Sequence, residues 1–215
     1  MDFGDQGSFH PVIKFPPHYI VLDLSKSDAL MKIGDQKEPF TIGKFNEARP
    51  YLYQQNLFIG GSKDPRNIHM GIDLGAPAWS PVYSFDSGIL IAQGQLPDEG
   101  DYGHSIVVEY TWRLDQPLVA QSMERRRGET YWALYGHLSA SSLNQHRVGD
   151  HIKIGEQLGF LGDSKENGGW APHLHFQLSM ERPIGHDLPG AVSENDRSSS
   201  LELYPDPRQV LGPLY

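Results

Sequence analysis

The segment PHLHFQLSM at residues 172–180 carries two histidines, His173 and His175, that are two positions apart. In a β-strand alternate side chains point to opposite faces, so this spacing places both imidazoles on one face and the apolar side chains on the other. The apolar face can anchor the strand, and the imidazoles are then not needed for packing. Such a pair is a candidate for metal binding or proton transfer, whereas a single histidine on a strand is more often structural.

A second candidate pair lies in the segment IHMGIDLGAPAW, where His69 and Asp73 are four residues apart. This even spacing also suits one face of a strand, in which Gly71 keeps the backbone open and Gly75 helps to end the strand. A helix of the H-E-x-x-H type has the same spacing, but Met70 stands where that motif has glutamate, and the glycines disfavour a helix. The pattern therefore predicts a strand. On its own, the H-x-x-x-D spacing is only weak evidence for a metal site.

A further histidine, His137, ends the apolar run YWALYGHLS at residues 131–139, at an expected turn. The chain has no cysteine, so a bound metal must use histidine, aspartate or glutamate. A catalytic zinc needs three protein ligands, which would leave two of the candidates for proton transfer and oxyanion stabilisation. The full candidate set is His69, Asp73, His137, His173 and His175.

Short β-rich runs separated by turn residues fill the chain between residues 68 and 180. The 23 glycines and 16 prolines among 215 residues favour many turns and short strands over long helices. These features predict a compact antiparallel β-domain and exclude a helical bundle. The expected strands are residues 80–85, 88–93, 105–112, 130–138, 151–154, 157–161 and 172–180.

The chain on either side of these strands is predicted to be mostly irregular. Residues 19–24 (YIVLDL) are predicted to form a strand, followed by one or two helical turns that Ser25 or Ser27 could cap. The basic run MERRRGE belongs to a polar stretch that is most simply a long exposed hairpin loop. The predicted irregular segments are an arm at 1–18, an extended coil at 35–67, loops at 114–129 and 193–200, and a docked or flexible tail at 204–215.

The charge balance restricts the expected partners. The chain has 18 basic and 27 acidic residues, for a formal net charge of −9. This is the wrong sign for binding nucleic acid phosphates or an anionic lipid surface, so neither nucleic acid nor a membrane is an expected partner. No apolar run reaches the length of about 18 residues that spans a bilayer, and the first residues lack the apolar core of a signal peptide. The sequence therefore predicts a cytoplasmic location.

The three motifs H-x-x-x-D, Y-G-H-L and P-H-L-H-F occur in an order and spacing that resemble the lysostaphin-type (LytM-like) zinc metalloendopeptidases. Members of that family cleave peptide bonds in the cross-bridges and stems of bacterial cell walls. The resemblance implies that zinc is bound by His69, Asp73 and His175. It also implies that His137 and His173 are catalytic residues that do not bind the metal.

The stretch VGDHIKIGEQLGFLGDS at residues 148–164 is similar to another segment of the same family, V-G-D-x-V-x-x-G-x-x-I-G-x-x-G. The resemblance implies the family's fold, an all-β core of antiparallel sheet with a barrel-sandwich, or duplicated hybrid, motif. It also implies three parts. These are an N-terminal extension that wraps the core at 1–65, a zinc metallopeptidase domain at 66–180 and a C-terminal tail at 181–215.

The sequence departs from the family pattern beside the H-x-H pair. Trp170 and Ala171 stand where the family usually has Thr-Gly or Ser-Gly, so the rim of the substrate groove is expected to differ. The segments EARPYLY and YPDPRQVLG resemble the flanks of the domain of this family that is fused beside class III aminotransferases in large cytoplasmic proteins.

The expected function is zinc-dependent hydrolysis of a peptide bond in a peptide or peptidoglycan fragment. A hydrolase of small cytoplasmic amides or peptides is one alternative. A non-catalytic binding or activating module of the same fold is another, but such modules typically lose metal ligands, and all five candidate residues are present. Residues 148–162 alone also resemble the strands of biotinyl and lipoyl carrier domains. A carrier domain is a poor interpretation, because no modifiable lysine lies in a carrier motif.

Several other side chains that could do chemistry are expected to be structural or exposed. Tyr102 and Tyr135 could contact substrate or merely pack, and neither is assigned a role. A structural or surface role is expected for His104, and solvent-exposed positions are expected for the remaining histidines, which are His10, His18, His146, His151 and His186.

Overall fold

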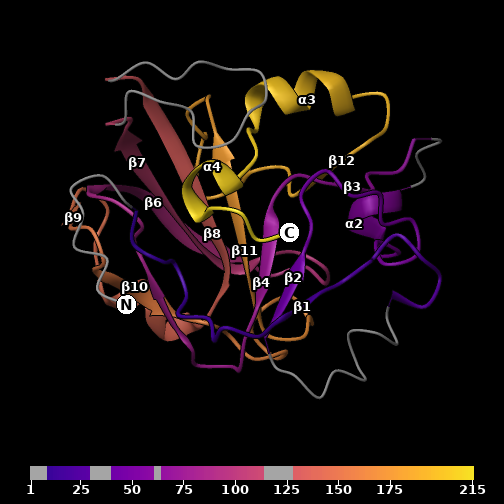
Figure 1. Cartoon of the computed structure of the whole chain (residues 1–215), viewed down its shortest axis with the longest axis horizontal. Helices are drawn as coiled ribbons and strands as arrows, with labels where there is room; N and C mark the ends of the chain where they lie inside the picture. The colour runs from indigo at the N-terminus through magenta and orange to yellow at the C-terminus, as the bar shows by residue number, and fades with distance from the viewer. Residues whose placement is uncertain (1–8, 30–39, 61–63, 114–127) are drawn as a thin grey trace.

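An eight-stranded sheet forms the centre of the molecule (Figure 1). The computed structural model of the chain describes residues 9–29, 40–60, 64–113 and 128–215. Neighbouring strands of this sheet run antiparallel, apart from the first two in sheet order, which are parallel. In sheet order the strands are β1 (Ile20–Val21), β2 (Thr41–Gly43), β4 (Ile72–Gly75), β11 (His173–Ser179), β8 (Thr130–Leu138), β7 (Gly103–Thr111), β6 (Gly88–Leu96) and β9 (His151–Ile152).

Two antiparallel pairs of short strands lie outside the central sheet. They are β3 (Ile68–His69) with β12 (Ala191–Val192), and β5 (Pro81–Tyr83) with β10 (Gln157–Phe160). The described helices are short: α2 (Asn56–Ile59), the 3₁₀ helix η1 (Ala140–Asn144), α3 (Arg197–Leu203) and α4 (Arg208–Leu211). The protein is therefore all-β, as the sequence predicts.

The main hydrophobic core lies between one face of the central sheet and the pair β5–β10. Leu174, Phe176 and Leu178 of β11 are buried in this core and are at most 1% exposed. Val82 of β5 and Leu158 of β10 belong to the same core. The intervening residues of β11, which include both histidines, point to the opposite face. This arrangement confirms the alternation expected for the strand.

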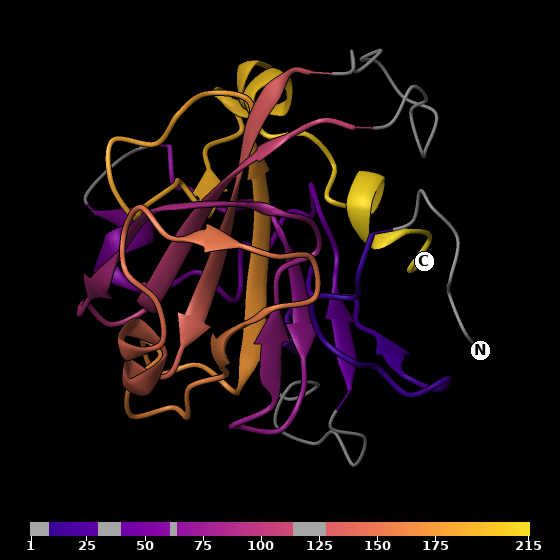
Figure 2. The ribbon, with the colours of Figure 1, turned by 90° about the vertical axis from the view of Figure 1, so that its left-hand side faces the viewer.

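The C-terminal residues pack onto the β-structure. The strand β12 pairs with β3, and Val210 of α4 is buried in the main core. Figures 1 and 2 both place α3 (yellow) at the top of the molecule, beyond the ends of the central strands. The segment from residue 204 onwards is therefore a docked tail rather than a flexible one.

Two segments that were expected to be irregular contain short regular elements. The predicted extended coil at 35–67 contains β2 and α2, and α3 begins inside the predicted loop at 193–200. The strand β2 forms by pairing with β4, which is a tertiary contact that the local sequence does not encode. Polar side chains lead into α3, where the Ser193 hydroxyl accepts a hydrogen bond from the backbone N–H of Asp196.

Two predicted strands also differ from the structure. The strand expected at 19–24 is only the two residues of β1, and β1 pairs in parallel. The single strand expected to carry His69 and Asp73 is divided, because β3 pairs with β12 whereas β4 pairs with β2 and β11. Residues 1–8 of the predicted arm, the helical turns expected beyond residue 29, and residues 114–127 of the predicted loop lie outside the described residues.

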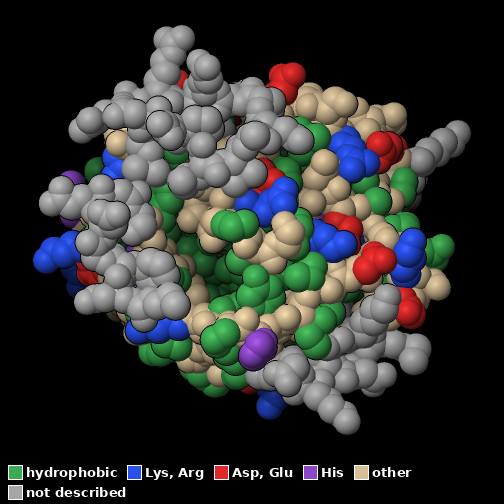
Figure 3. All heavy atoms as spheres, viewed as in Figure 1, with side chains coloured by type: hydrophobic (Ala, Val, Ile, Leu, Met, Phe, Trp, Pro, Cys, Tyr) green, Lys and Arg blue, Asp and Glu red, His purple; other side chains and the backbone are tan. Residues whose placement is uncertain are grey.

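Charged side chains of both signs lie beside one another on the face shown in Figure 3, and hydrophobic side chains gather towards its centre. Over the part of the chain that the structure describes, no helix has the length and apolar character needed to cross a membrane.

Candidate metal centre

Three neighbouring strands bring four of the five candidate residues together. In β11, His175 lies opposite Asp73 of β4 on one side and opposite Gly136 of β8 on the other. His173 lies two residues earlier on β11, and His137 follows Gly136 on β8. The fifth residue, His69, is supplied by β3, which belongs to a separate strand pair.

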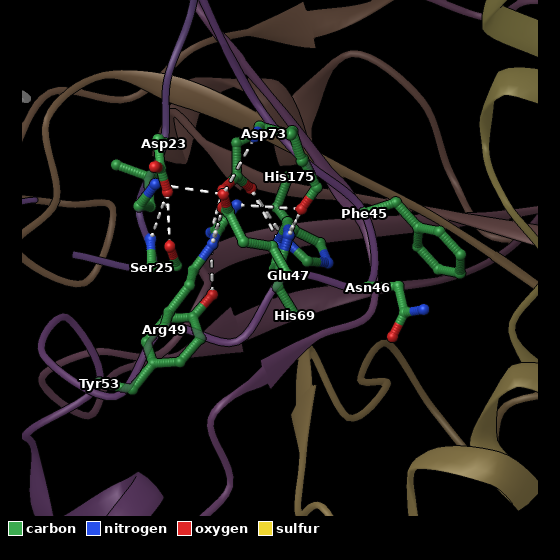
Figure 4. Close-up of polar contacts among 12 residues, drawn as sticks. Asp23, Ser25, Phe45, Asn46, Glu47, Arg49, Tyr53, His69, Asp73 and His175 are labelled. Atoms are coloured by element: carbon green, nitrogen blue, oxygen red, sulfur yellow. Dashed lines mark hydrogen bonds and ion pairs between the residues drawn. The ribbon is translucent and has the colours of Figure 1, made fainter. Parts of the chain in front are cut away.

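The three residues expected to be metal ligands converge on one point (Figure 4). The Nε2 atom of His69 lies 3.0 Å from Nδ1 of His175 and 3.1 Å from Oδ1 of Asp73. The distance between His175 Nδ1 and Asp73 Oδ1 is 3.2 Å. Ligands at zinc-bond length around a tetrahedral ion are about 3.3 Å apart, so this group of atoms could bind a metal ion with little adjustment.

The remaining polar atoms of these three residues are engaged elsewhere. Nδ1–H of His69 donates to the carbonyl oxygen of Lys44 at 2.8 Å, and Nε2–H of His175 donates to Oε1 of Gln177 at 2.9 Å. Oδ2 of Asp73 accepts a 2.6 Å hydrogen bond from Arg49. Because these partners fix each imidazole tautomer, the unprotonated nitrogens and the second carboxylate oxygen all face the metal position.

Two glycines allow the backbone to approach the metal centre closely. A Cβ atom on Gly71 would lie 2.6 Å from the imidazole of His175, and one on Gly43 would lie 2.9 Å from Oδ2 of Asp73. Side chains at these positions would displace the two ligands. The role expected for Gly71, an open backbone within one continuous strand, is therefore corrected: Gly71 lies between two strands and makes room for a ligand.

The buried side chain of Arg49 links the metal centre to the segment before β3. Arg49 is 1% exposed and donates to Asp73, to Oε2 of Glu47 at 3.1 Å and to the hydroxyl of Tyr53 at 3.1 Å. A buried guanidinium is stable only when charged and polar partners satisfy it, and these groups do so. This cluster is not among the features predicted from the sequence. Its only signal was the segment EARPY, in which both charges are close to a proline.

The electrostatic environment favours metal-binding protonation states. Burial, together with the nearby charge of Arg49, lowers the pKa of His69 to about 4, so the imidazole is neutral near pH 7. Burial opposes ionisation of Asp73, but the guanidinium of Arg49 and the imidazole of His69, which is protonated at the low pH where this carboxyl titrates, outweigh it and hold the pKa of Asp73 well below its usual range. Near pH 7 the centre therefore presents a neutral nitrogen on His69 and an anionic oxygen on Asp73.

The two expected catalytic residues, His137 and His173, lie beside each other, with ring centroids 4.3 Å apart. Nδ1–H of His137 donates to the carbonyl oxygen of Asn167, and Nδ1–H of His173 donates to that of Ala171. Nε2 is therefore the basic nitrogen in each ring. Burial lowers the pKa of both imidazoles. Nε2 of His173 is 3.7 Å from Oδ1 of Asp73, so the pair adjoins the metal position.

His137 has a positive φ of 63°, which is uncommon for a residue with a side chain. Its N–H donates to the carbonyl oxygen of Tyr102, and its own carbonyl oxygen accepts from the N–H of Gly162. These bonds fix the ring against His173. Backbone strain of this kind persists where the surrounding structure holds it, and it is concentrated at functional sites.

Tyr102, which was assigned no role, packs against the metal centre. Its hydroxyl donates to the carbonyl oxygen of Leu188 at 3.0 Å and is 3.4 Å from Nε2 of His175. Tyr135, by contrast, is buried in the main core, where its hydroxyl bonds to that of Tyr110. Gly136 makes room for Tyr102, because a Cβ atom there would be 2.5 Å from the tyrosine ring. Such contacts between distant residues leave no signal in the local sequence.

The other histidines lie away from the metal centre. His104 is buried in β7, and its Nδ1 has no hydrogen-bond partner among the residues that the structure describes. His18 and His151 are exposed, as expected. His10, His146 and His186 are partly buried, so the expectation of full exposure is wrong for them. His186, for example, packs over Gly94.

A cavity of about 420 Å³ adjoins the metal centre. Asp73, His137, His173 and His175 line one side of it. The other lining residues are mostly apolar and include Trp170, one of the two residues that depart from the family pattern. A substrate of modest size could therefore reach all four polar side chains from one space.

The fold and the site together define an all-β protein with three potential metal ligands beside a cavity. The family described as Peptidase family M23 matches residues 67–185, more than half of the chain. The protein therefore belongs to peptidase family M23, which confirms the resemblance to the lysostaphin-type enzymes. Its assignment to the aminotransferase-associated subgroup stays a prediction.

Two relatives with assigned names are similar to part of the chain. "DD-carboxypeptidase/endopeptidase Mpg" of Neisseria meningitidis serogroup B is 30% identical over 126 residues, which cover 57% of this chain and 23% of that protein. "Peptidoglycan DD-endopeptidase ShyA" of Vibrio cholerae is 26% identical over 136 residues, covering 59% of this chain and 26% of that protein. The chain thus matches only about a quarter of the length of these relatives.

Solved structures of similar proteins include two catalytic domains. The catalytic domain of the prophage-encoded M23 protein EnpA from Enterococcus faecalis is 24% identical with a TM-score of 0.43, and the match covers 72% of this chain and 92% of that one. The catalytic domain of lysostaphin from Staphylococcus simulans is 22% identical with a TM-score of 0.39, covering 59% and 76%.

Proposed function

We propose that this protein is a zinc-dependent peptidase that hydrolyses a peptide bond. The observation that supports this most strongly is the convergence of His69 Nε2, Asp73 Oδ1 and His175 Nδ1 at mutual distances of 3.0–3.2 Å. Each of these atoms is left available by a hydrogen bond to the other end of its side chain. Nitrogen and oxygen ligands in this number are typical of catalytic zinc sites.

In this proposal His69, Asp73 and His175 hold the zinc. When bound, zinc would supply an acidified water molecule and polarise the carbonyl group of the scissile bond. Arg49 holds Oδ2 of Asp73, which leaves Oδ1 directed to the metal. Burial keeps His69 neutral, so its Nε2 lone pair is available near pH 7.

His137 and His173 would handle the protons of the reaction. Hydrolysis adds a water oxygen to the carbonyl carbon, breaks the carbon–nitrogen bond and transfers a proton to the leaving amine. One imidazole, through its Nε2, would accept the proton of the water and pass it on to the amine. The other imidazole, whose Nδ1–H is already bonded to a backbone carbonyl, would stabilise the oxyanion on the carbonyl oxygen when its Nε2 is protonated. Both rings line the same cavity as the metal ligands, which supports a shared substrate.

We infer a peptide or peptidoglycan-fragment substrate, because the two named relatives are DD-peptidases. The net charge of −9 predicts weak binding to intact, anionic cell walls and no binding to nucleic acid or membranes.

The three-part division at 1–65, 66–180 and 181–215 is also proposed, with the added feature that residues 44–53 contribute to the site. The cytoplasmic location remains a prediction from the sequence.

Metal analysis of the purified protein tests the proposal. After zinc supplementation and dialysis, we expect about one zinc per chain, with only nitrogen and oxygen neighbours in X-ray absorption spectra. The zinc-loaded protein should hydrolyse members of a panel of peptidoglycan fragments and short peptides, and a chelator should abolish this activity. A protein that consistently remains free of metal would exclude the enzyme and favour a non-catalytic module.

A further inference from the structure

Part of the lining of the cavity is a cluster of apolar side chains next to the metal centre, which we call the apolar wall. It is assembled from three distant parts of the chain: the segment after β1, the segment from residue 52 through α2, and the turn before β11. Its members are Leu22, Leu24, Leu52, Tyr53, Leu57, Phe58 and Trp170.

The apolar wall is packed as a small core of its own. Tyr53 and Phe58 stack with ring centroids 4.5 Å apart, and Trp170 meets Tyr53 edge-on at 6.2 Å. Arg66, which also lines the cavity, adds contacts: its guanidinium lies 5.8 Å from the ring of Phe58 and donates to the carbonyl oxygen of Leu57. Side chains held in this way form a fixed surface rather than one that closes when empty.

This apolar wall is continuous with both groups of polar residues. The Tyr53 hydroxyl accepts a hydrogen bond from Arg49, which also binds Asp73. Trp170 lies 6.4 Å from the ring of His137, measured between centroids. A peptide bond placed at the metal centre would therefore have the apolar wall within one side-chain length in the same cavity.

We propose that the apolar wall binds the side chain of a residue next to the scissile bond, so that the preferred substrates carry a bulky aliphatic or aromatic residue there. This inference rests on the proposed peptidase function and narrows its substrate class. A glycine at that position would leave the apolar surface uncovered, which is unfavourable in water. The cavity volume of about 420 Å³ suits a short peptide segment.

Matched peptide substrates test the proposal with the zinc-loaded full chain. Two series differ only in the residue on the amino or the carboxyl side of the scissile bond, with glycine, alanine, leucine or phenylalanine at that position. For one of the two sides we expect kcat/KM to be about 10- to 200-fold higher with leucine or phenylalanine than with glycine. Equal or faster cleavage of the glycine peptides in both series would overturn the proposal.

The variant Leu57→Ala tests the apolar wall directly. Leu57 is partly buried, so its truncation should leave the fold intact and reduce the preference for leucine over glycine several-fold. Leu96→Ala is the matched control, because Leu96 is a partly buried residue of another cluster and does not line the cavity. If Leu57→Ala retains the full preference, the apolar wall does not bind the side chain.

Hydroxamates, which bind zinc without being cleaved, separate this proposal from the proposed function. We expect calorimetry to show tighter binding of N-acetyl-leucine hydroxamate than of N-acetyl-glycine hydroxamate, by about 10-fold or more. Equal affinities in zinc-loaded protein would refute the binding of an apolar side chain while leaving the peptidase proposal in place. Absence of bound zinc would instead refute the peptidase proposal itself.

Discussion

The metal centre is built from two regions that differ in how they contribute. The strands β3, β4, β8 and β11 supply side chains for chemistry, including His69, Asp73 and His175. The segment from residue 44 to residue 58 supplies no expected ligand, yet it holds those side chains through Lys44 and Arg49 and forms much of the apolar wall. The residues that perform a reaction and those that position them can therefore lie in separate parts of a chain.

The two regions also differ in how charge is treated. Four imidazoles lie around a single carboxylate on the strand side, and burial keeps the imidazoles of His69, His137 and His173 neutral near pH 7. The segment side places a buried Arg49 between the carboxylates of Asp73 and Glu47. The strand side is thus prepared to accept a cation, whereas the segment side is already neutralised by its own ion pairs.

The largest effect is expected from removal of a metal ligand. His69→Ala, Asp73→Ala and His175→Ala should each lose most of the zinc and all activity, because each variant deletes one of only three ligands. Metal analysis after dialysis and a hydrolysis assay would measure both. His151→Ala, at an exposed position on β9, is the control and should change neither. Loss of zinc in His173→Ala together with its retention in His175→Ala would reverse the assignment within the H-x-H pair.

A smaller effect is expected for the two neighbouring histidines. His137→Ala and His173→Ala should keep zinc near one per chain while kcat falls by about 10²- to 10⁴-fold, the usual contribution of general acid–base catalysis. Steady-state kinetics and metal analysis of the same samples would separate the two groups of strand residues. Full activity of His137→Ala on a confirmed substrate would show that this residue is not catalytic.

Arg49→Met tests whether the segment positions the centre or only covers it. Without the guanidinium, Oδ2 of Asp73 is free to turn towards the metal, so zinc affinity should fall by about 10- to 100-fold. The visible spectrum of the cobalt-substituted protein should also weaken, since a bidentate carboxylate raises the coordination number. Arg208→Met, which removes an ion pair with Asp206 at the surface, is the control. Unchanged zinc affinity and an unchanged spectrum in a folded Arg49→Met protein would show that the segment 44–58 covers the metal centre without positioning its ligands.

The smallest effect is expected outside both regions, at Trp79. This residue shares a positive φ with His137, at 68°, but its side chain is 54% exposed and does not line the cavity. Trp79→Gly should therefore raise the free energy of unfolding by up to about 1 kcal/mol in urea denaturation, with no change in activity. His137→Gly is the comparison, because it relieves similar strain but removes a proton carrier. A loss of activity in Trp79→Gly would extend the site to this turn.

Local patterns in the sequence were sufficient for the strand side of the centre. The alternation around His173 and His175 predicted which face carries the imidazoles, because the period of a strand is fixed by its backbone geometry. The apolar run at 130–138 predicted β8 with the same bounds as in the structure. The absence of cysteine limited the ligands to nitrogen and oxygen. All of these properties depend on residue types and on short spacings along the chain.

Only the tertiary structure determined which atoms face the metal and what holds them. Nε2 of His69 and Nδ1 of His175 converge because Lys44, brought in with β2, binds the other nitrogen of His69, whereas Gln177, on the same face of β11, binds that of His175. Arg49 reaches Asp73 across 24 positions of sequence. Such contacts depend on strand register and on the approach of distant backbones, and a shift of one residue would turn every side chain of a strand to its other face. Residue type and spacing therefore determined the candidate ligands, whereas the pairing of distant segments determined their geometry.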